Sequence, residues 1–168
     1  LSLADSNDTR ESLVSLALIC TLIISYLAGG LWINDAAHFS NTLVDEKPPI
    51  SPGWSVGWYF IPIAFLWKPY QAMTQLYRIS LNPKQWNSID YPAILPIWWC
   101  LWLFSNVSGS IVFRVSGNAE ELSAIQTLSL VHLILAIVDI ALDFVFLRIA
   151  QEISKNFQRL VVMSQQGD

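Results

Sequence analysis

Residues 12–33 read SLVSLALICTLIISYLAGGLWI and contain no Asp, Glu, Lys or Arg. Three further stretches are comparably apolar, at residues 48–67, 91–113 and 122–147, and Asp139 and Asp143 are the only such charges in them. An α-helix rises 1.5 Å per residue, so about 20 apolar residues cross a hydrocarbon core of ~30 Å. The sequence therefore predicts an all-α integral membrane bundle of four transmembrane helices, at residues 12–33, 52–67, 91–113 and 122–147.

The composition agrees with a membrane protein and excludes several other classes. Of the 168 residues, 54% are hydrophobic and 13% charged, whereas a soluble domain has about 25% charged residues. Nine Lys and Arg against 13 Asp and Glu give a net charge of −4, which argues against nucleic acid as a partner. Two cysteines exclude a disulfide scaffold. No phosphate-binding loop, nucleophile motif or metal-ligand set is present, so we expect neither a cofactor nor catalysis.

The basic residues predict the orientation in the membrane, because cytoplasmic loops are rich in Lys and Arg. With four spans, seven of the nine basic residues lie on the side of both termini and of the loop at residues 68–90. Residues 1–11 and the helix and tail at residues 148–168 are then cytoplasmic, around a membrane domain at residues 12–147. We also interpret this charge bias as evidence that the second segment crosses the membrane. We expect that a re-entrant second segment would instead divide the basic residues almost evenly between the two sides.

The second span has unusual local features. It begins at Ser51-Pro52, a favourable helix start, and Pro62 predicts a kink in its middle. Lys68-Pro69 marks a second break. Beyond it, Met73, Leu76 and Tyr77 share one face, which predicts a short amphipathic cytoplasmic helix at residues 69–80. The alternative is a simple continuation of the second span.

Small residues recur four positions apart in the outer half of each predicted span. This spacing lets membrane helices approach closely. We therefore expect tight helix packing on that side, at the pairs Ser25 and Gly29, Gly53 and Gly57, Ser105 and Gly109, and Ser123 and Thr127.

Three of the eight tryptophans lie near the middle of the third span, and Trp98 and Trp102 share a face there. A buried indole N–H requires a partner. One interpretation is an aromatic-lined cavity for a lipid, a quinone or another apolar ligand. The other is bulky packing, with the N–H groups bonded to neighbouring helices.

The fourth span carries His132, Asp139 and Asp143 on one helical face. Charged groups at membrane depth are costly and normally face a bundle interior or water, so we expect Asp139 to face the bundle. These groups would serve a proton relay or an ion path. Alternatively they are structural, with the acids hydrogen-bonded or paired with Lys68 or Arg78. A metal centre is disfavoured, because the only other histidine, His38, lies at another depth.

Residues 52–80 read PGWSVGWYFIPIAFLWKPYQAMTQLYRIS. This stretch resembles the hallmark of a bacterial multi-span family catalogued as domain of unknown function 4328, and the resemblance extends over roughly residues 10–160. It implies four spans in a bacterial inner membrane and supplies no activity. It directs attention to Lys68, Tyr70, Gln71 and Arg78, which would bind a lipid headgroup or a partner. The structural alternative is an interfacial elbow that fixes a short surface helix.

Together these features favour a non-catalytic membrane subunit or scaffold that binds lipid, a membrane-protein partner or further copies of itself. The alternative is a small oligomeric transporter or channel that uses the acidic residues of the fourth span.

Overall fold

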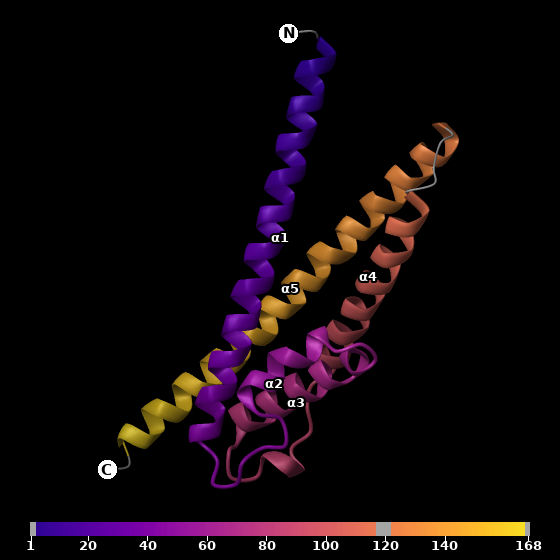
Figure 1. Cartoon of the computed structure of the whole chain (residues 1–168). Coiled ribbons are helices and arrows are strands. Elements are labelled where there is room, and N and C mark those ends of the chain that lie inside the picture. Colours follow the sequence, from indigo (N-terminus) through magenta and orange to yellow (C-terminus); the bar gives the residue numbers. More distant parts are fainter. Residues whose placement is uncertain (1–2, 117–121, 167–168) are drawn as a thin grey trace.

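The structure, a computed structural model, describes residues 3–116 and 122–166. Within these ranges the chain forms helices joined by turns and contains no β-strand, which confirms the all-α prediction. Three helices are long, namely α1 (Leu3–Thr42), α4 (Ile94–Ser116) and α5 (Leu122–Gln166), and two are short, α2 (Pro52–Gly57) and α3 (Lys68–Leu81) (Figure 1).

The three long helices are long and apolar enough to cross a membrane, over Thr9–Thr42, Ile94–Val115 and Gln126–Gln166. At 1.5 Å per residue, α1 with 40 residues and α5 with 45 measure about 60 and 68 Å, well beyond a hydrocarbon core. The start of α1 and the end of α5 lie at opposite ends of the molecule (Figure 1). These helices indicate a membrane protein.

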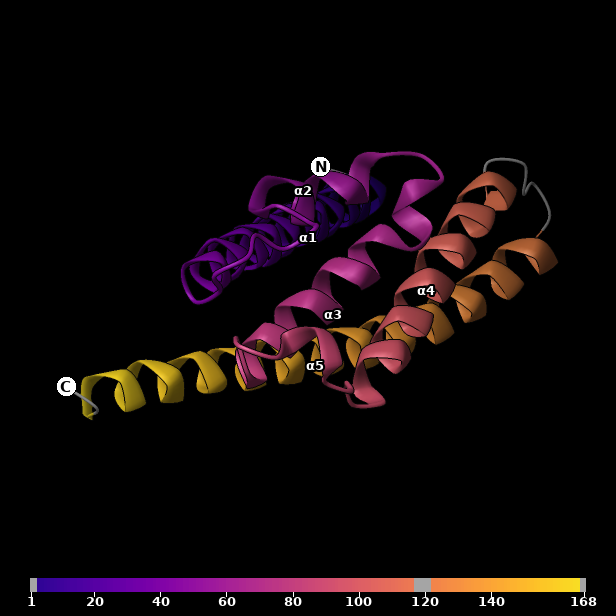
Figure 2. The ribbon, with the colours of Figure 1, turned by 90° about the horizontal axis from the view of Figure 1, so that it is seen from below.

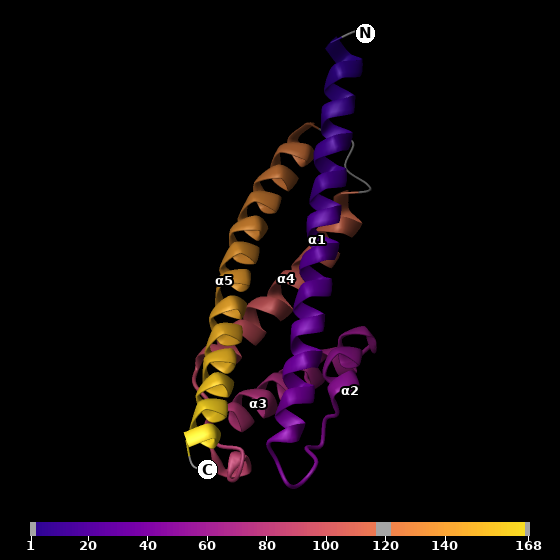
Figure 3. The same ribbon diagram turned by 90° about the vertical axis from the view of Figure 1, so that its left-hand side faces the viewer.

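Residues 52–67 do not form one continuous helix, so the predicted four-span count is not confirmed. Helix α2 ends at Gly57, and short turns of 3-10 helix follow at Trp58–Phe60 and Ala64–Leu66 before α3 begins. Pro62 accounts for the interruption, because it removes a backbone donor and forces the preceding residue out of the helical region. Accordingly Ile61 is extended, with φ −94° and ψ 117°. A chain reversal replaces the expected kink, and α2 and α3 gather at the end where α5 terminates (Figure 3).

Ile63 occupies a strained turn at this reversal. Its φ of 71° and ψ of −54° are those of the rare γ-turn, which the Ala64 N–H closes by donating to the Pro62 carbonyl at 2.8 Å. A β-branched residue seldom adopts positive φ. The Ile63 side chain is 68% exposed, so packing around this side chain does not compensate for the strain.

We predict that Ile63→Gly stabilises the fold. Releasing backbone strain of about 1–3 kcal/mol outweighs the extra chain entropy of glycine, about 0.5–1 kcal/mol. Reversible unfolding in detergent should therefore show a gain of about 1 kcal/mol. Ile61→Gly is the matched control and should destabilise the protein, because Ile61 has an ordinary extended backbone. Equal losses in the two variants would contradict the strain assignment.

The hydrophobic core lies at the end of the molecule that holds α3. Helix α3 packs between the last turns of α1, the first turns of α4 and the middle of α5 (Figure 2). The buried side chains of α1 and α5 recur every three or four positions, so that each helix presents one face to α3. The principal members of this core are Ile33, Ala37, Met73, Leu76, Ile79, Leu95, Trp98, Ile149, Ile153 and Phe157.

The other half of the molecule exposes its apolar side chains. Residues 13–31 of α1 and 130–147 of α5 carry many exposed Leu, Ile and Val side chains, and α1 diverges from α4 and α5 there (Figure 1). Exposed apolar surface of this extent is suited to lipid.

The glycines of the predicted small-residue pairs differ in their surroundings. A Cβ added at Gly53 or Gly109 would meet nothing within 4 Å, and one at Gly57 would meet Trp54 of its own helix at 3.2 Å. A Cβ added at Gly29 would lie 3.7 Å from the Phe146 ring of α5, and the Ser105 hydroxyl of α4 contacts Asp139 of α5. The Ser123 side chain lies outside the described residues.

Candidate functional site

Helix α3 has one face toward the core and another toward a surface cavity. On the core face, the Tyr77 hydroxyl donates to Glu152 Oε1 at 2.7 Å, and Asn156 Nδ2 donates to Ser80 Oγ at 3.3 Å. These two contacts join α3 to the part of α5 beyond its apolar stretch. They hold α3 in a fixed position, and the opposite face of α3 lines the surface cavity.

The cavity has a volume of about 470 Å³. Its walls come from the loop before α2, from α2 and the turn after it, from α3, and from the segment before α4. All four residues singled out in and after the Trp-Lys-Pro-Tyr-Gln segment line it, namely Lys68, Tyr70, Gln71 and Arg78. The remaining lining residues are Pro49, Ile50, Ser51, Trp54, Trp58, Thr74, Gln75, Trp86 and Tyr91.

Gln75 fixes one wall of the cavity. Its amide accepts a hydrogen bond from the Ile50 N–H at 3.1 Å and donates one to the Ile50 carbonyl at 2.9 Å. This pair of bonds ties the loop before α2 to the middle of α3. Nearby, the rings of Trp54 and Trp58 lie 4.6 Å apart and form an aromatic wall.

Two cations lie against aromatic rings of the cavity. Lys68 Nζ is 5.5 Å from the centre of the Trp58 ring, and Arg78 Cζ is 5.0 Å from that of Tyr91, within the range of a cation–π interaction. None of the lining residues is Asp or Glu. The Arg78 Nε is buried and has no hydrogen-bond partner among the described residues. The cavity is therefore electropositive.

The two tyrosines of α3 remain neutral. Burial, followed by a hydrogen bond with Tyr91, raises the pKa of Tyr70 to about 12. Burial and the hydrogen bond to Glu152 raise the pKa of Tyr77 further. Both phenols are therefore protonated near neutral pH, and they do not offset the charge of Lys68 and Arg78.

The tryptophans of α4 pack against protein and do not line the cavity. Trp98 is 2% exposed and lies against Phe146. Trp99 stacks on Trp102 at 4.8 Å, and its Nε1 donates to the Leu66 carbonyl at 3.2 Å. Trp102 meets the rings of Tyr59 and Phe65. These contacts favour the packing interpretation for Trp98 and Trp102, with α4 supporting the interrupted segment.

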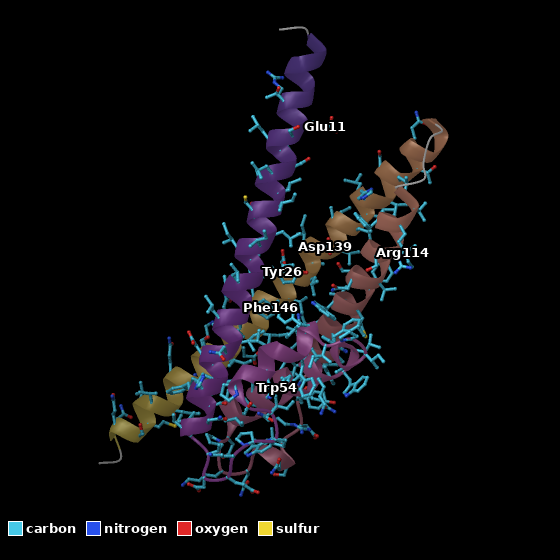
Figure 4. The ribbon with its side chains drawn as sticks, in the orientation of Figure 1. Glu11, Tyr26, Trp54, Arg114, Asp139 and Phe146 are labelled. Atoms are coloured by element: carbon cyan, nitrogen blue, oxygen red, sulfur yellow. The ribbon has the colours of Figure 1, made fainter. Side chains whose placement is uncertain are left out.

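The acidic residues of α5 form a separate polar group at membrane depth. Asp139 accepts a hydrogen bond from the Ser105 hydroxyl of α4, so it is turned toward another helix, although it is not buried. Tyr26 of α1 lies within electrostatic range of Asp139 and Asp143, and Figure 4 shows Tyr26 and Asp139 at neighbouring levels. His132 Nδ1 is 2.9 Å from the Leu128 carbonyl of its own helix. In the described part of the chain, no three His, Cys, Asp or Glu side chains are grouped to hold a metal.

Several residues of the cavity were not singled out from the sequence. Trp86 and Tyr91 come from the segment after α3, and Gln75 reaches a loop 25 positions away. The sequence signal for these residues was the concentration of aromatic residues before and after α3. That concentration does not indicate that the aromatic side chains line one cavity.

The three long apolar helices indicate a helical membrane protein. Its electropositive aromatic cavity lies beside the interrupted apolar segment, outside the long apolar stretches. The chain belongs to the family described as Domain of unknown function (DUF4328), whose model matches residues 1–155. No curated protein and no solved structure matches the chain.

Proposed function

We propose that this protein is a non-catalytic membrane protein that binds an anionic lipid headgroup in the α3 cavity. The observation that carries the proposal is the pair Lys68 and Arg78, held over aromatic rings in a cavity lined by no carboxylate. A lipid phosphate supplies the negative charge that these two side chains lack in the cavity. Arginine and lysine are the usual side chains for phosphate.

The surroundings of the cavity support a lipid as the source of the phosphate. Phe60 and Ile63, on the chain reversal beside it, are 82% and 68% exposed, and Trp54 and Trp67 are also exposed. Tryptophan and basic residues concentrate where the hydrocarbon meets the headgroups, and apolar side chains beyond them enter the acyl region. The interrupted segment is thus a re-entrant element that enters the bilayer from one side.

The same reasoning leads us to propose three crossings in a bacterial inner membrane, with α3 and the end of α5 in the cytoplasm and the start of α1 outside. This arrangement puts seven basic residues on the cytoplasmic side, namely Lys47, Lys68, Arg78, Lys84, Arg148, Lys155 and Arg159, and leaves Arg10 and Arg114 outside. The expected even division for a re-entrant second segment is therefore wrong. The three-span and the four-span topologies both place seven basic residues on the cytoplasmic side and two outside. The charge bias therefore supports a cytoplasmic position for the end of the molecule that holds α3, and it does not decide the number of spans.

Binding of phosphatidylglycerol to the purified protein in neutral detergent tests the proposal. Removal of both cations leaves the phosphate without a charged partner and should weaken binding by at least tenfold, since a hydrogen bond to a charged group contributes about 1.5 kcal/mol or more. Lys68→Gln with Arg78→Gln should therefore abolish detectable preference over phosphatidylcholine. Lys84→Gln removes a charge from the same side of the protein without touching the cavity, and should bind as the unmodified chain does. Unchanged preference in the double variant would refute the proposed site.

A further inference from the structure

We infer that the α3 cavity selects a phosphomonoester headgroup, which carries two negative charges, over the singly charged phosphodiester of lipids such as phosphatidylglycerol. Phosphatidic acid is the simplest lipid of this class. The inference rests on the proposed function and specifies its ligand. It follows from the charge that the cavity leaves unbalanced and from the kind of hydrogen-bonding groups that line it.

The cavity contains two cations and no carboxylate that neutralises them. Lys68 and Arg78 both line it, and none of the lining residues is Asp or Glu. Both cationic side chains are partly buried, so their charges are screened less than those of fully exposed residues. The acidic residues of the neighbouring segments, Asp45, Glu46 and Asp90, do not line the cavity. Two positive charges therefore remain to be balanced by a ligand.

The contacts of Arg78 lead back to the part of the cavity where Lys68 lies. Arg78 Cζ is 5.0 Å from the centre of the Tyr91 ring. The Tyr91 ring is 6.1 Å from that of Tyr70, to which Tyr91 is also hydrogen-bonded. Tyr70 follows Lys68 by two positions in the first turn of α3. Because Coulomb attraction falls only as the inverse of distance, one anion in this space is attracted by both cations, even if it touches only one of them.

A phosphodiester balances one of these two charges, whereas a phosphomonoester balances both. The monoester carries about 1.5 to 2 negative charges near neutral pH, because its second pKa is about 6. The Coulomb energy is proportional to the charge of the ligand, so the second negative charge adds attraction to each cation. The cavity lies at the surface, which lets the phosphate keep part of its hydration and limits the cost of binding a doubly charged group.

The side chains that line the cavity are mainly hydrogen-bond donors. Three are tryptophans, whose indole N–H can only donate, and Lys68 and Arg78 also only donate. The Gln75 amide contains an acceptor, but it is already paired with the backbone of Ile50. A fully ionised phosphomonoester presents three strong acceptor oxygens. The glycerol of phosphatidylglycerol instead adds hydroxyl donors, which require acceptors that this lining supplies poorly.

The test compares phosphatidic acid with phosphatidylglycerol at two pH values. The purified chain in neutral detergent is titrated with mixed micelles of phosphatidylcholine that contain one anionic lipid or the other. Trp54, Trp58 and Trp86 line the cavity and report occupancy through their fluorescence. At pH 8 we expect phosphatidic acid to bind at least tenfold more tightly, because its phosphate is then doubly charged. At pH 5 its phosphate is mainly singly charged, and the advantage should fall to about twofold.

This pH dependence is expected to come from the lipid and not from the cavity. Histidine is the side chain that ordinarily changes its charge between pH 5 and 8, and the titratable residues that line the cavity are Lys68, Tyr70, Arg78 and Tyr91. Phosphatidylglycerol, measured at both pH values, is the control for ionisable groups elsewhere. The elements that form or support the cavity carry such groups outside it, among them His38, Asp45, Glu46, Lys47, Lys84, Asp90 and Glu152.

Gln71→Glu tests the charge balance without removing either cation. Gln71 lines the cavity and is exposed, and glutamate has nearly the same shape. The added carboxylate neutralises one positive charge, so the preference for phosphatidic acid at pH 8 should fall from tenfold to about twofold. Gln85→Glu makes the same change at an exposed position outside the cavity and should retain the full preference. Thermal unfolding of both variants serves as the folding control.

The outcomes separate this inference from the proposed function. Equal affinity for the two anionic lipids at pH 8, or an advantage of phosphatidic acid that is the same at pH 5, would overturn the phosphomonoester inference and leave the anionic lipid site intact. Equal losses of preference in Gln71→Glu and Gln85→Glu would indicate a general attraction to the more highly charged micelle, and would also overturn it. No preference of the unmodified chain for either anionic lipid over phosphatidylcholine would overturn both proposals. Equally tight binding of soluble glycerol 3-phosphate would overturn the lipid as the source of the phosphate.

Discussion

A cysteine introduced at Lys84 and one introduced at Gln165 are expected to react with a membrane-impermeant maleimide from the same side, and one at Arg10 from the opposite side. Lys84 follows α3 and Gln165 ends α5, while Arg10 lies near the start of α1. All three side chains are exposed. Because residues 52–67 are divided by the reversal at Ile61 to Ile63, an odd number of long helices separates Arg10 from the other two positions.

The labelling is performed in a background with Cys20→Ser and Cys100→Ser, which removes the two native thiols. Labelling of intact cells is compared with labelling of inverted membrane vesicles, so every position has its own positive control. The effect is nearly all-or-none, because a charged maleimide does not cross the bilayer. If all three positions label from one side, residues 52–67 cross the membrane and the four-span prediction is correct.

The long helices could be predicted from the sequence because their signal is local. Residues 12–33 need only an uninterrupted apolar run, and the same holds for most of α4 and α5. The amphipathic helix after Lys68-Pro69 was also predictable, since Met73, Leu76 and Tyr77 recur at helical spacing and are buried in the structure. Each of these features depends on residues that are neighbours in the chain.

The interruption of the second apolar segment was not predictable in the same way. Its composition resembles that of a spanning helix, and Pro62 alone is compatible with a kink. The reversal depends on support from elsewhere, notably the Trp99 N–H that donates to the Leu66 carbonyl and the rings packed on Trp102. A carbonyl released by a broken helix must find a donor, and the sequence does not state which distant indole supplies it.

Part of the candidate site could be predicted because some of its residues are close together in the sequence. Lys68, Tyr70, Gln71 and Arg78 lie within eleven positions and line one cavity. Trp86 comes from another segment. Ile50 and Tyr91 also come from other segments, and their place in the cavity depends on the tertiary contacts of Gln75 and Arg78.

Ile153→Ala is expected to destabilise the protein by about 2–5 kcal/mol, the usual loss when a large aliphatic side chain is truncated in a close-packed core. Ile153 is 0% exposed and belongs to the core around α3. Its removal leaves a cavity, because Met73 and Leu76 on the neighbouring helix are themselves buried and fixed by packing.

Ile140→Ala is the matched control, since it makes the same truncation in the same helix at a side chain that is 70% exposed. Acyl chains fill the space that the lost methyl groups leave, so no cavity forms and the expected loss is within about 0.5 kcal/mol, as at other exposed positions. Reversible unfolding in mixed micelles, followed by circular dichroism, measures both values. A larger loss at Ile140 would mean that the apolar half of α5 packs against protein in the membrane. The stability of the fold would then depend on contacts in the bilayer and not on the core that positions the cavity.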